Sequence, residues 1–214
     1  QGGPHLNTIA AQATAFKFAK TERFIELQRQ AIVNSKVMAD TLETQGLRIP
    51  FGGTDSHLLN IDCSSIVGED GTSLSGDLAA RILDIAGIVG NRNTIPGDRS
   101  ALRPSGVRLG THWITERGFK EKETAELAEL IADLLKACKP YSIAGRRRPL
   151  QRAKVDFNEL NRIKNRVRDL AECMGKDFPL TSHGYPHFYY SDDEVPAGAY
   201  ARIGFRYGAV SEIL

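Results

Sequence analysis

The chain has 214 residues, of which 41% are hydrophobic and 25% charged, with a formal net charge of +2 at pH 7. This ordinary globular composition excludes a disordered, collagen-like or coiled-coil chain, and at this length a core can form without disulfide staples. Cys63, Cys138 and Cys173 are far apart and form no Cys-x-x-Cys pair, which excludes a disulfide framework and favours a cytoplasmic location. No apolar run approaches the roughly 20 residues of a membrane span, so no membrane partner is expected.

The first part of the chain is predicted to hold two helices followed by two strands. Residues 8–18 are rich in alanine and carry apolar residues at helical spacing, which predicts a helix that packs closely on another surface. Residues 21–45 carry an apolar stripe that predicts a long amphipathic helix, ended by Gly46. Alternating apolar and polar residues then predict strands over 47–51 and 57–63, joined by a glycine-rich turn.

The remainder is predicted to be mostly helical with one long interruption. Apolar stripes predict helices over 73–86 and 120–138. Between them, glycine and proline punctuate residues 87–115, which predicts a loop between two short extended segments. Two prolines and three consecutive arginines predict a linker over 139–154, followed by a last helix that Asp156 caps. Helices that alternate with a few short strands predict an α+β domain at the end of a larger α/β protein.

Several well-known catalytic and metal-binding motifs are absent from the sequence. There is no Gly-x-Gly-x-x-Gly, no phosphate-binding P-loop, no His-Glu-x-x-His and no Gly-x-Ser-x-Gly. The histidines are scattered, and between His183 and His187 a glycine and a proline interrupt any helical metal pair. We therefore expect no metal site.

The glycines at the start of the chain offer one candidate binding element. Gln1-Gly2-Gly3-Pro4 leads directly into the first predicted helix. Gly2 and Gly3 would let backbone N–H groups approach an anion such as phosphate, which the helix dipole also favours. An ordinary turn before a helix accounts for the same residues, so these residues alone do not establish a phosphate site.

Arg108 is the strongest candidate for binding a small anionic group. In Gly-Val-Arg-Leu-Gly, residues 106–110, a strand would turn Val107 and Leu109 to the core and Arg108 to the opposite face. A guanidinium matches a carboxylate through two parallel hydrogen bonds, which a lysine cannot form. The alternative is a surface arginine paired with a neighbouring acid, and periodicity does not decide between the two.

Two further patterns have simpler explanations that we favour. Residues 91–94 (Asn-Arg-Asn-Thr) before Pro96-Gly97 offer amides that can read a heterocycle edge, but asparagine is also ordinary turn chemistry there. The excess of basic residues between Arg146 and Lys176 is compatible with nucleic-acid binding. Because few aromatic residues are interleaved, a solvated linker and helix face is favoured, and a nucleic-acid partner is not expected.

Five segments together resemble the pyridoxal-phosphate-dependent serine hydroxymethyltransferases. They are QGGPHLNTIAA at 1–11, GGTDSHLL at 52–59, NRNTIPGD at 91–98, SGVRLGT with TERGF at 105–119, and RIKNRVRDLAECMGKDFPL at 162–180. Their order and spacing agree with the family, and the resemblance covers residues 1–180. It implies that residues 1–20 end a fold type I large domain and that 21–180 form the small carboxy-terminal domain, with a short antiparallel sheet and helices. Residues 181–214 form an extension of unknown role, either an added interface or the start of another domain.

The resemblance implies an enzyme that reversibly transfers a one-carbon unit between serine and tetrahydrofolate, giving glycine and 5,10-methylenetetrahydrofolate. Its cofactor would be pyridoxal 5'-phosphate, with tetrahydrofolate as co-substrate. The family's Schiff-base lysine lies upstream of the Gln-Gly-Gly segment, so no catalytic residue is expected in this chain, which should be inactive alone. The expected partners are the missing N-terminal portion, as the same or a separate chain, and further copies in a homodimer or dimer of dimers.

The resemblance also implies roles for individual residues. Arg108 would hold the substrate α-carboxylate, while Gly2 and Gly3 would reach the cofactor phosphate of the neighbouring subunit. His112-Trp113 departs from the family's common Pro-Ala, next to the substrate arginine. A folate-independent aldolase or aminotransferase of the same fold type, or a noncatalytic interaction module with a basic tail, are the alternatives. The predicted folate contacts, after a one-residue gap, are Asn93, Ser100, Ala101 and Leu102.

Overall fold

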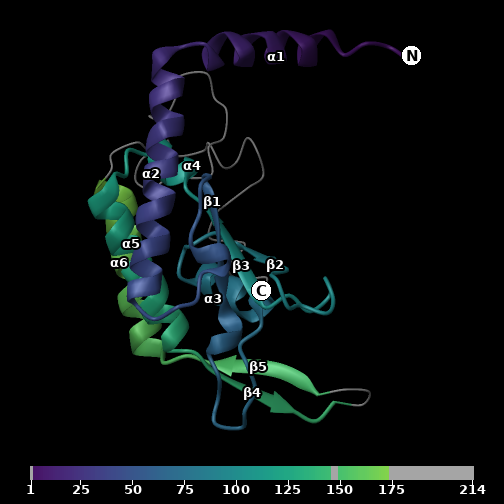
Figure 1. The fold of residues 1–214 in the computed structure, drawn as a ribbon, viewed down its shortest axis with the longest axis vertical. Helices are drawn as coiled ribbons and strands as arrows, with labels where there is room; N and C mark the ends of the chain where they lie inside the picture. Colours follow the sequence, from purple (N-terminus) through teal and green to yellow (C-terminus); the bar gives the residue numbers. More distant parts are fainter. Residues whose placement is uncertain (1, 146–148, 174–214) are drawn as a thin grey trace, which may run out of the picture. The chain divides into compact units, whose positions relative to one another are not determined.

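Helices and two small antiparallel sheets make up the described part of the protein. The computed structural model describes residues 2–145 and 149–173 (Figure 1). This mixed α/β content agrees with the predicted α+β class. In chain order the elements are α1 (Leu6–Ala19), α2 (Glu22–Thr44), η1 (Pro50–Gly52), β1 (Leu58–Asp62), η2 (Cys63–Ser65), α3 (Gly76–Ile85), β2 (Asn91–Asn93), β3 (Gly106–Gly110), α4 (His112–Glu116), α5 (Glu121–Lys136), β4 (Lys139–Ile143), β5 (Leu150–Lys154) and α6 (Phe157–Cys173).

The three-stranded sheet has the order β1-β3-β2, and both pairs are antiparallel. Successive residues of a strand point to opposite faces, so one face of β1 and β3 is apolar and the other polar. The apolar face belongs to the core, since each of its side chains is at most 5% exposed. These core-facing side chains are Leu59, Ile61, Val107 and Leu109.

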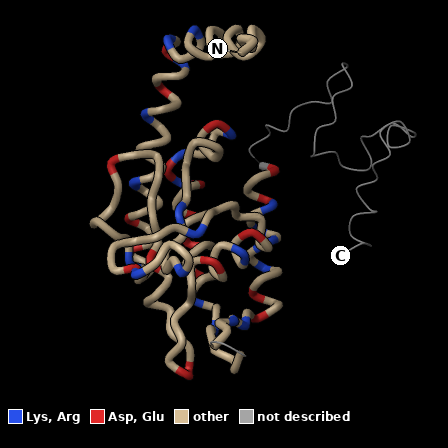
Figure 2. Tube along the Cα trace, turned by 90° about the vertical axis from the view of Figure 1, so that its right-hand side faces the viewer, with Lys and Arg blue, Asp and Glu red and all other residues tan. Residues whose placement is uncertain are grey.

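Helices α2, α5 and α6 lie side by side next to this sheet (Figure 1). Among the described helices α5 has the most buried residues, because its apolar stripe contacts α2 and α6 and continues the core of the sheet. On its solvent side, Arg162 and Arg166 of α6 bind Asp133 and Glu126 of α5. Acidic and basic residues are interspersed along the described trace (Figure 2).

Side-chain caps explain where three of the helices begin. Thr21 accepts a hydrogen bond from the Phe24 N–H at the start of α2, and Ser75 caps α3 in the same way. Asp156 accepts a hydrogen bond from the Glu159 N–H at 2.9 Å. The predicted cap of the last helix is therefore confirmed.

A buried polar network ties α4 to α2. The Asn34 amide donates to Thr115 Oγ1 and to the Phe119 carbonyl, both at 2.9 Å, and is fully buried. Thr111 donates its hydroxyl to the Ala31 carbonyl at 2.6 Å. Because buried polar groups are costly without partners, these bonds fix the position at which β3 passes into α4.

Two predicted elements are wrong. Residues 47–51 do not form a strand: Arg48 makes one isolated bridge to Asp62, and the chain then turns through Pro50–Gly52. Pro50 has no N–H for a ladder, and Phe51 adopts a positive φ of 70°, which ends any extended run.

The linker predicted over 139–154 is also wrong, because these residues form the β4–β5 hairpin. A distant loop supports the hairpin, since the Ser142 N–H donates to Asp70 at 2.8 Å. That bond and one from the Thr72 N–H hold the pKa of Asp70 below its usual value. Because Asp70 lies 72 residues from Ser142, no local sequence pattern predicts this contact.

Helix α1 differs from the others because it has no buried residue. Its predicted close packing partner is not found among the described residues, and Leu6, Ile9 and Phe16 are all more than half exposed. By their contacts, Gln1–Met174 form one compact unit, and the boundary predicted near residue 20 stays a prediction. The extension at 181–214 lies outside the described residues. No helix in the described ranges has the length and apolarity to cross a bilayer.

Candidate functional site: the polar face of the three-stranded sheet

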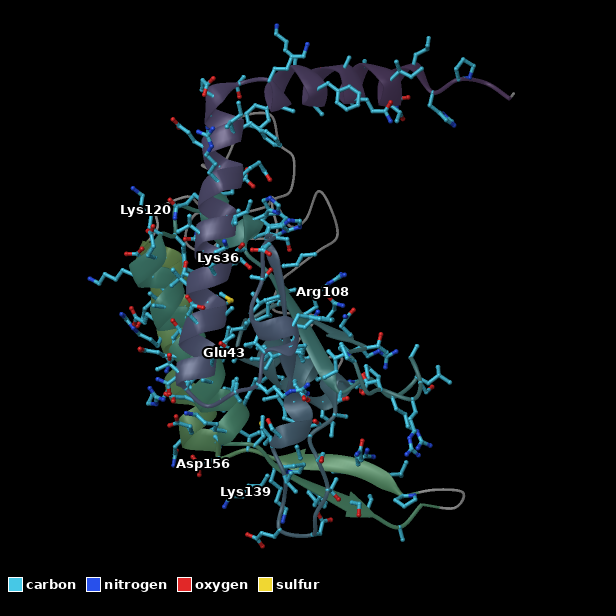
Figure 3. The ribbon with its side chains drawn as sticks, viewed as in Figure 1. Lys36, Glu43, Arg108, Lys120, Lys139 and Asp156 are labelled. Carbon is cyan, nitrogen blue, oxygen red and sulfur yellow. The ribbon has the colours of Figure 1, made fainter. Side chains whose placement is uncertain are left out.

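Arg108 lies at the centre of the three-stranded sheet, on its exposed face (Figure 3). The register places it directly between Asn60 of β1 and Asn91 of β2. Strand periodicity therefore orients the side chain as the sequence predicted, with Val107 and Leu109 in the core. A row of one guanidinium flanked by two amides crosses the sheet.

The guanidinium of Arg108 is bound by an amide and not by an acid. Its Nε–H donates to Asn91 Oδ1 at 3.2 Å, and no carboxylate among the described residues pairs with it. The nearby acid Asp77 instead binds Arg92 at 2.8 Å and Arg81 at 3.1 Å. The surface ion pair is therefore not found among the described residues, and the binding of a ligand by Arg108 stays a prediction.

Asn93 lies two residues along β2 from Asn91, and its amide nitrogen is already used. Nδ2 donates to Asn60 Oδ1 at 3.2 Å and to the Thr94 carbonyl at 3.0 Å. Both amide hydrogens are therefore bound, which leaves Oδ1 as the group that Asn93 offers to a ligand. Such an acceptor fits the N–H or amino group of a heterocycle.

Asp98 closes the loop that follows Asn93. Its carboxylate accepts hydrogen bonds from the Ile95 and Ser105 N–H groups, both at 3.0 Å, and from the Ser105 hydroxyl. Burial raises the pKa of Asp98, but the bonds from Ser105 and Ile95 outweigh it, so the pKa lies below its ordinary value. The carboxylate therefore stays ionised and holds both ends of the loop together.

The loop closed by Asp98 carries the other three predicted folate residues on its surface. Ser100 Oγ accepts a hydrogen bond from the Leu102 N–H at 3.2 Å, which shapes the turn. Ala101 is exposed, and Leu102 is 85% exposed. The Leu102 side chain is therefore available for contact with an apolar surface. The structure does not place Leu102 against Asn93.

Gly2 and Gly3 lie before α1 and are fully open. A Cβ at either position would meet nothing within 4 Å, and Gly2 has a positive φ of 55°. No side chain caps α1, since His5 makes no cap hydrogen bond. The first N–H groups of this 14-residue helix are therefore available to an anion. The structure does not bring these glycines together with Arg108.

A histidine pair lies where β3 passes into α4. The rings of His57 and His112 are 4.2 Å apart, and His112 Nε2 is 2.6 Å from Gln28 Oε1. Burial, and then the proximity of His57, lower the pKa of His112, so its neutral form is favoured. Trp113, next to it, is 78% exposed. The first two residues of α4, His112 and Trp113, thus place two aromatic side chains at the end of the sheet.

The cysteines offer neither a nucleophile nor a metal site in the described ranges. Cys63 and Cys138 are buried and unpaired, and burial raises the pKa of each thiol to about 12. No group of three or more His, Cys, Asp or Glu side chains within residues 2–145 and 149–173 could hold a metal ion. His183 and His187 lie outside these ranges.

Two residues of the site escaped the sequence analysis. Asn60 lies in the strand that the sequence predicts over 57–63, and a polar residue at the centre of an apolar run is a signal that could identify it. Asp98 ends the segment 91–98, and its contact with Ser105, seven residues further along the chain, has no local sequence signal. Asn60 accepts a hydrogen bond from Asn93, and Asp98 joins the two ends of the loop that carries Ser100, Ala101 and Leu102.

The exposed face of the sheet thus combines a guanidinium between two amides with a loop that Asp98 closes. The family model "Serine hydroxymethyltransferase" matches residues 1–131, and the chain belongs to this family. It is 43% identical over 164 residues to the mitochondrial serine hydroxymethyltransferase of Candida glabrata, covering 77% of this chain and 32% of that protein. It is 39% identical over 188 residues to the serine hydroxymethyltransferase of Bombyx mori, covering 84% of this chain and 38% of that protein. The chain thus spans about a third of the length of these curated relatives.

Proposed function

We propose that the full-length protein is a serine hydroxymethyltransferase and that this chain forms its carboxy-terminal part. The reaction is the reversible transfer of a one-carbon unit between serine and tetrahydrofolate, giving glycine and 5,10-methylenetetrahydrofolate. Membership of the family supports this reaction. The observation that carries it is Arg108, an exposed guanidinium to which no carboxylate of the described residues is bound.

Arg108 binds the α-carboxylate of serine or glycine in this proposal. Its two terminal nitrogens donate to no group among the described residues, while the Nε–H donates to Asn91. A guanidinium that presents two parallel N–H groups binds a carboxylate more strongly and with better orientation than an ammonium does. Holding the carboxylate fixes the substrate so that its reacting carbon is placed for chemistry.

The glycines before α1 fit the phosphate of pyridoxal 5'-phosphate. The space around Gly2 and Gly3 is open, and the N–H groups at the start of α1 are not capped by a side chain. When bound, the cofactor supplies the electron sink for cleavage of the substrate's carbon–carbon bond. We place this phosphate in the neighbouring subunit, which makes the active site shared across a homodimer, alone or within a dimer of dimers.

Folate recognition runs through the loop closed by Asp98. Asn93 Oδ1 accepts a hydrogen bond from the pterin, because both hydrogens of its amide are bound within the protein. Ser100, Ala101 and Leu102 contact the remainder of the folate from the exposed turn. The covalent chemistry belongs to the other two thirds of the family's length, so activity requires that part together with this chain.

The experiment is Arg108→Lys in the full-length protein with its cofactor. This change keeps the positive charge and loses the paired donors, so serine affinity and turnover should each fall on the order of tenfold or more. Arg23→Lys is the matched control, since Arg23 is exposed on α2 away from the sheet. Normal serine kinetics in Arg108→Lys would contradict the binding of the substrate carboxylate by Arg108, which we call the Arg108 clamp. The proposal would then lose its main support.

A further inference from the structure

The hydrogen bond between Arg108 and Asn91 decides which donors of the guanidinium remain for a ligand. A guanidinium has five N–H donors in a planar fork. The Nε–H donates to Asn91 Oδ1 at 3.2 Å across the strand pair β2–β3. The donors left are those of the two terminal nitrogens, whose end-on pair is one of the geometries that a carboxylate can bridge.

Asn91 is itself held in place. Its Nδ2 donates to the Arg92 carbonyl at 3.0 Å, which sets Oδ1 as the atom that faces Arg108. The neighbouring Arg92 pairs with Asp77 at 2.8 Å, and this ion pair ties β2 to α3. The atom that accepts from Arg108 is thus oriented by the backbone of its own strand, and not by the ion pair of the Arg92 side chain.

An amide at position 91 leaves the positive charge of Arg108 available to a ligand. An aspartate would accept the same hydrogen bond but would add a negative charge, which neutralises the guanidinium and competes with a ligand carboxylate. Asn60, on the other side of Arg108, is neutral as well, and its Oδ1 is occupied by Asn93. Arg108 therefore lies between two amides that leave its charge available.

We propose that Asn91 is a positioning residue for the substrate carboxylate: it holds the Arg108 guanidinium through Nε so that the two terminal nitrogens face the ligand. This inference rests on the proposed function, because it assigns the carboxylate to Arg108. Asn91 does not touch the substrate in this arrangement and acts only through the arginine.

The test is a double-mutant cycle in the full-length, cofactor-loaded protein, with glycine affinity measured by calorimetric titration. Asn91→Ala should weaken glycine binding by about three- to tenfold, the usual effect of one lost hydrogen bond. On an Arg108→Lys background the same change should have almost no effect, since the group that it orients is gone. Arg92→Ala on the same strand breaks an ion pair without touching Arg108 and should leave glycine binding unchanged.

The outcomes distinguish failure of the positioning role of Asn91 from failure of the proposed function. If Arg108→Lys binds glycine normally, the carboxylate assignment fails and the role of Asn91 fails with it. If Arg108→Lys is impaired but Asn91→Ala is not, the clamp stands and only the positioning role is overturned. An equal loss from Asn91→Ala on both backgrounds, or an equal loss in Arg92→Ala, would show a general effect on β2 and would also overturn it.

Discussion

The two faces of the three-stranded sheet are formed by the same strands but differ in role: one packs in the core and the other presents polar side chains. On the core face, Ile61 and Val107 are fully buried and contact the helices. On the outer face, Asn60, Arg108 and Asn91 form a polar row in register. Because residues alternate between faces, stability and ligand binding depend on adjacent residues that do not share contacts. Substitutions on one face should therefore leave the property of the other face intact.

The largest effect is expected on the core face. Ile61→Ala leaves a cavity at a side chain with no solvent exposure, and it should lower the free energy of unfolding by about 2–5 kcal/mol. Urea unfolding of the 214-residue chain measures this change. Ile85→Ala is the matched control, since Ile85 is 55% exposed and its loss should cost about 0.5 kcal/mol or less. Similar losses in both variants would contradict the described core.

The next effect concerns the glycines before α1, which belong to neither face. Gly3→Val should weaken cofactor retention in the full-length protein about tenfold, because a side chain there crowds the phosphate. Gly3 has no positive φ, and its Cβ position is open, so the thermal midpoint of this chain should not change. Cofactor occupancy is measured by absorbance after dialysis. Full occupancy in the variant would refute the phosphate contact.

A smaller and more selective effect is expected at Asn93 on the outer face. Asn93→Ala removes the free acceptor, so folate-dependent serine cleavage should fall by about three- to tenfold. Folate-independent cleavage of allo-threonine should stay unchanged, because the Arg108 clamp is intact. Asn158→Ala, at an exposed asparagine of α6, serves as the control. Equal loss of both activities would mean that Asn93 only braces its turn.

The smallest effect is a pH dependence of stability, caused by the histidine pair where β3 passes into α4. The folded protein holds the pKa of His112 below the 6.5 that applies when it is unfolded, first through burial and then through His57. The unfolded chain therefore binds more protons in mildly acidic solution, so stability should decrease as the pH falls below about 6.5. His112→Gln should flatten this slope between pH 7.5 and 5. Asp98 acts in a separate window near and below pH 3.8, because its pKa is also lowered.

The comparison between the two faces of the sheet does not extend to helix α1. It is predicted and observed as a helix, yet its apolar residues Ile9 and Phe16 are exposed, unlike those of α5. Local sequence is enough to form a helix, but burial needs a second surface. This chain matches about a third of the length of the curated relatives, and we expect the surface that covers α1 to lie in the rest of that length.

Local sequence determined most of the helices, the strand at 58–62 and the outward orientation of Arg108. These follow from periods of 3.6 and 2 residues and from short-range caps, which do not depend on the rest of the chain. The family and its predicted binding residues also followed from sequence alone, and the family is confirmed.

Only the tertiary structure decided which residues surround Arg108 and how the chain between the helices is held. Asn91 lies 17 residues from Arg108, Asn60 lies 33 from Asn93, and Asp70 lies 72 from the Ser142 that it supports. The strand misassigned at 47–51 and the hairpin misassigned as a linker at 139–154 have the same origin. Each depends on partners that the path of the chain brings close, and a short polar or proline-containing segment carries no local pattern that identifies a distant partner.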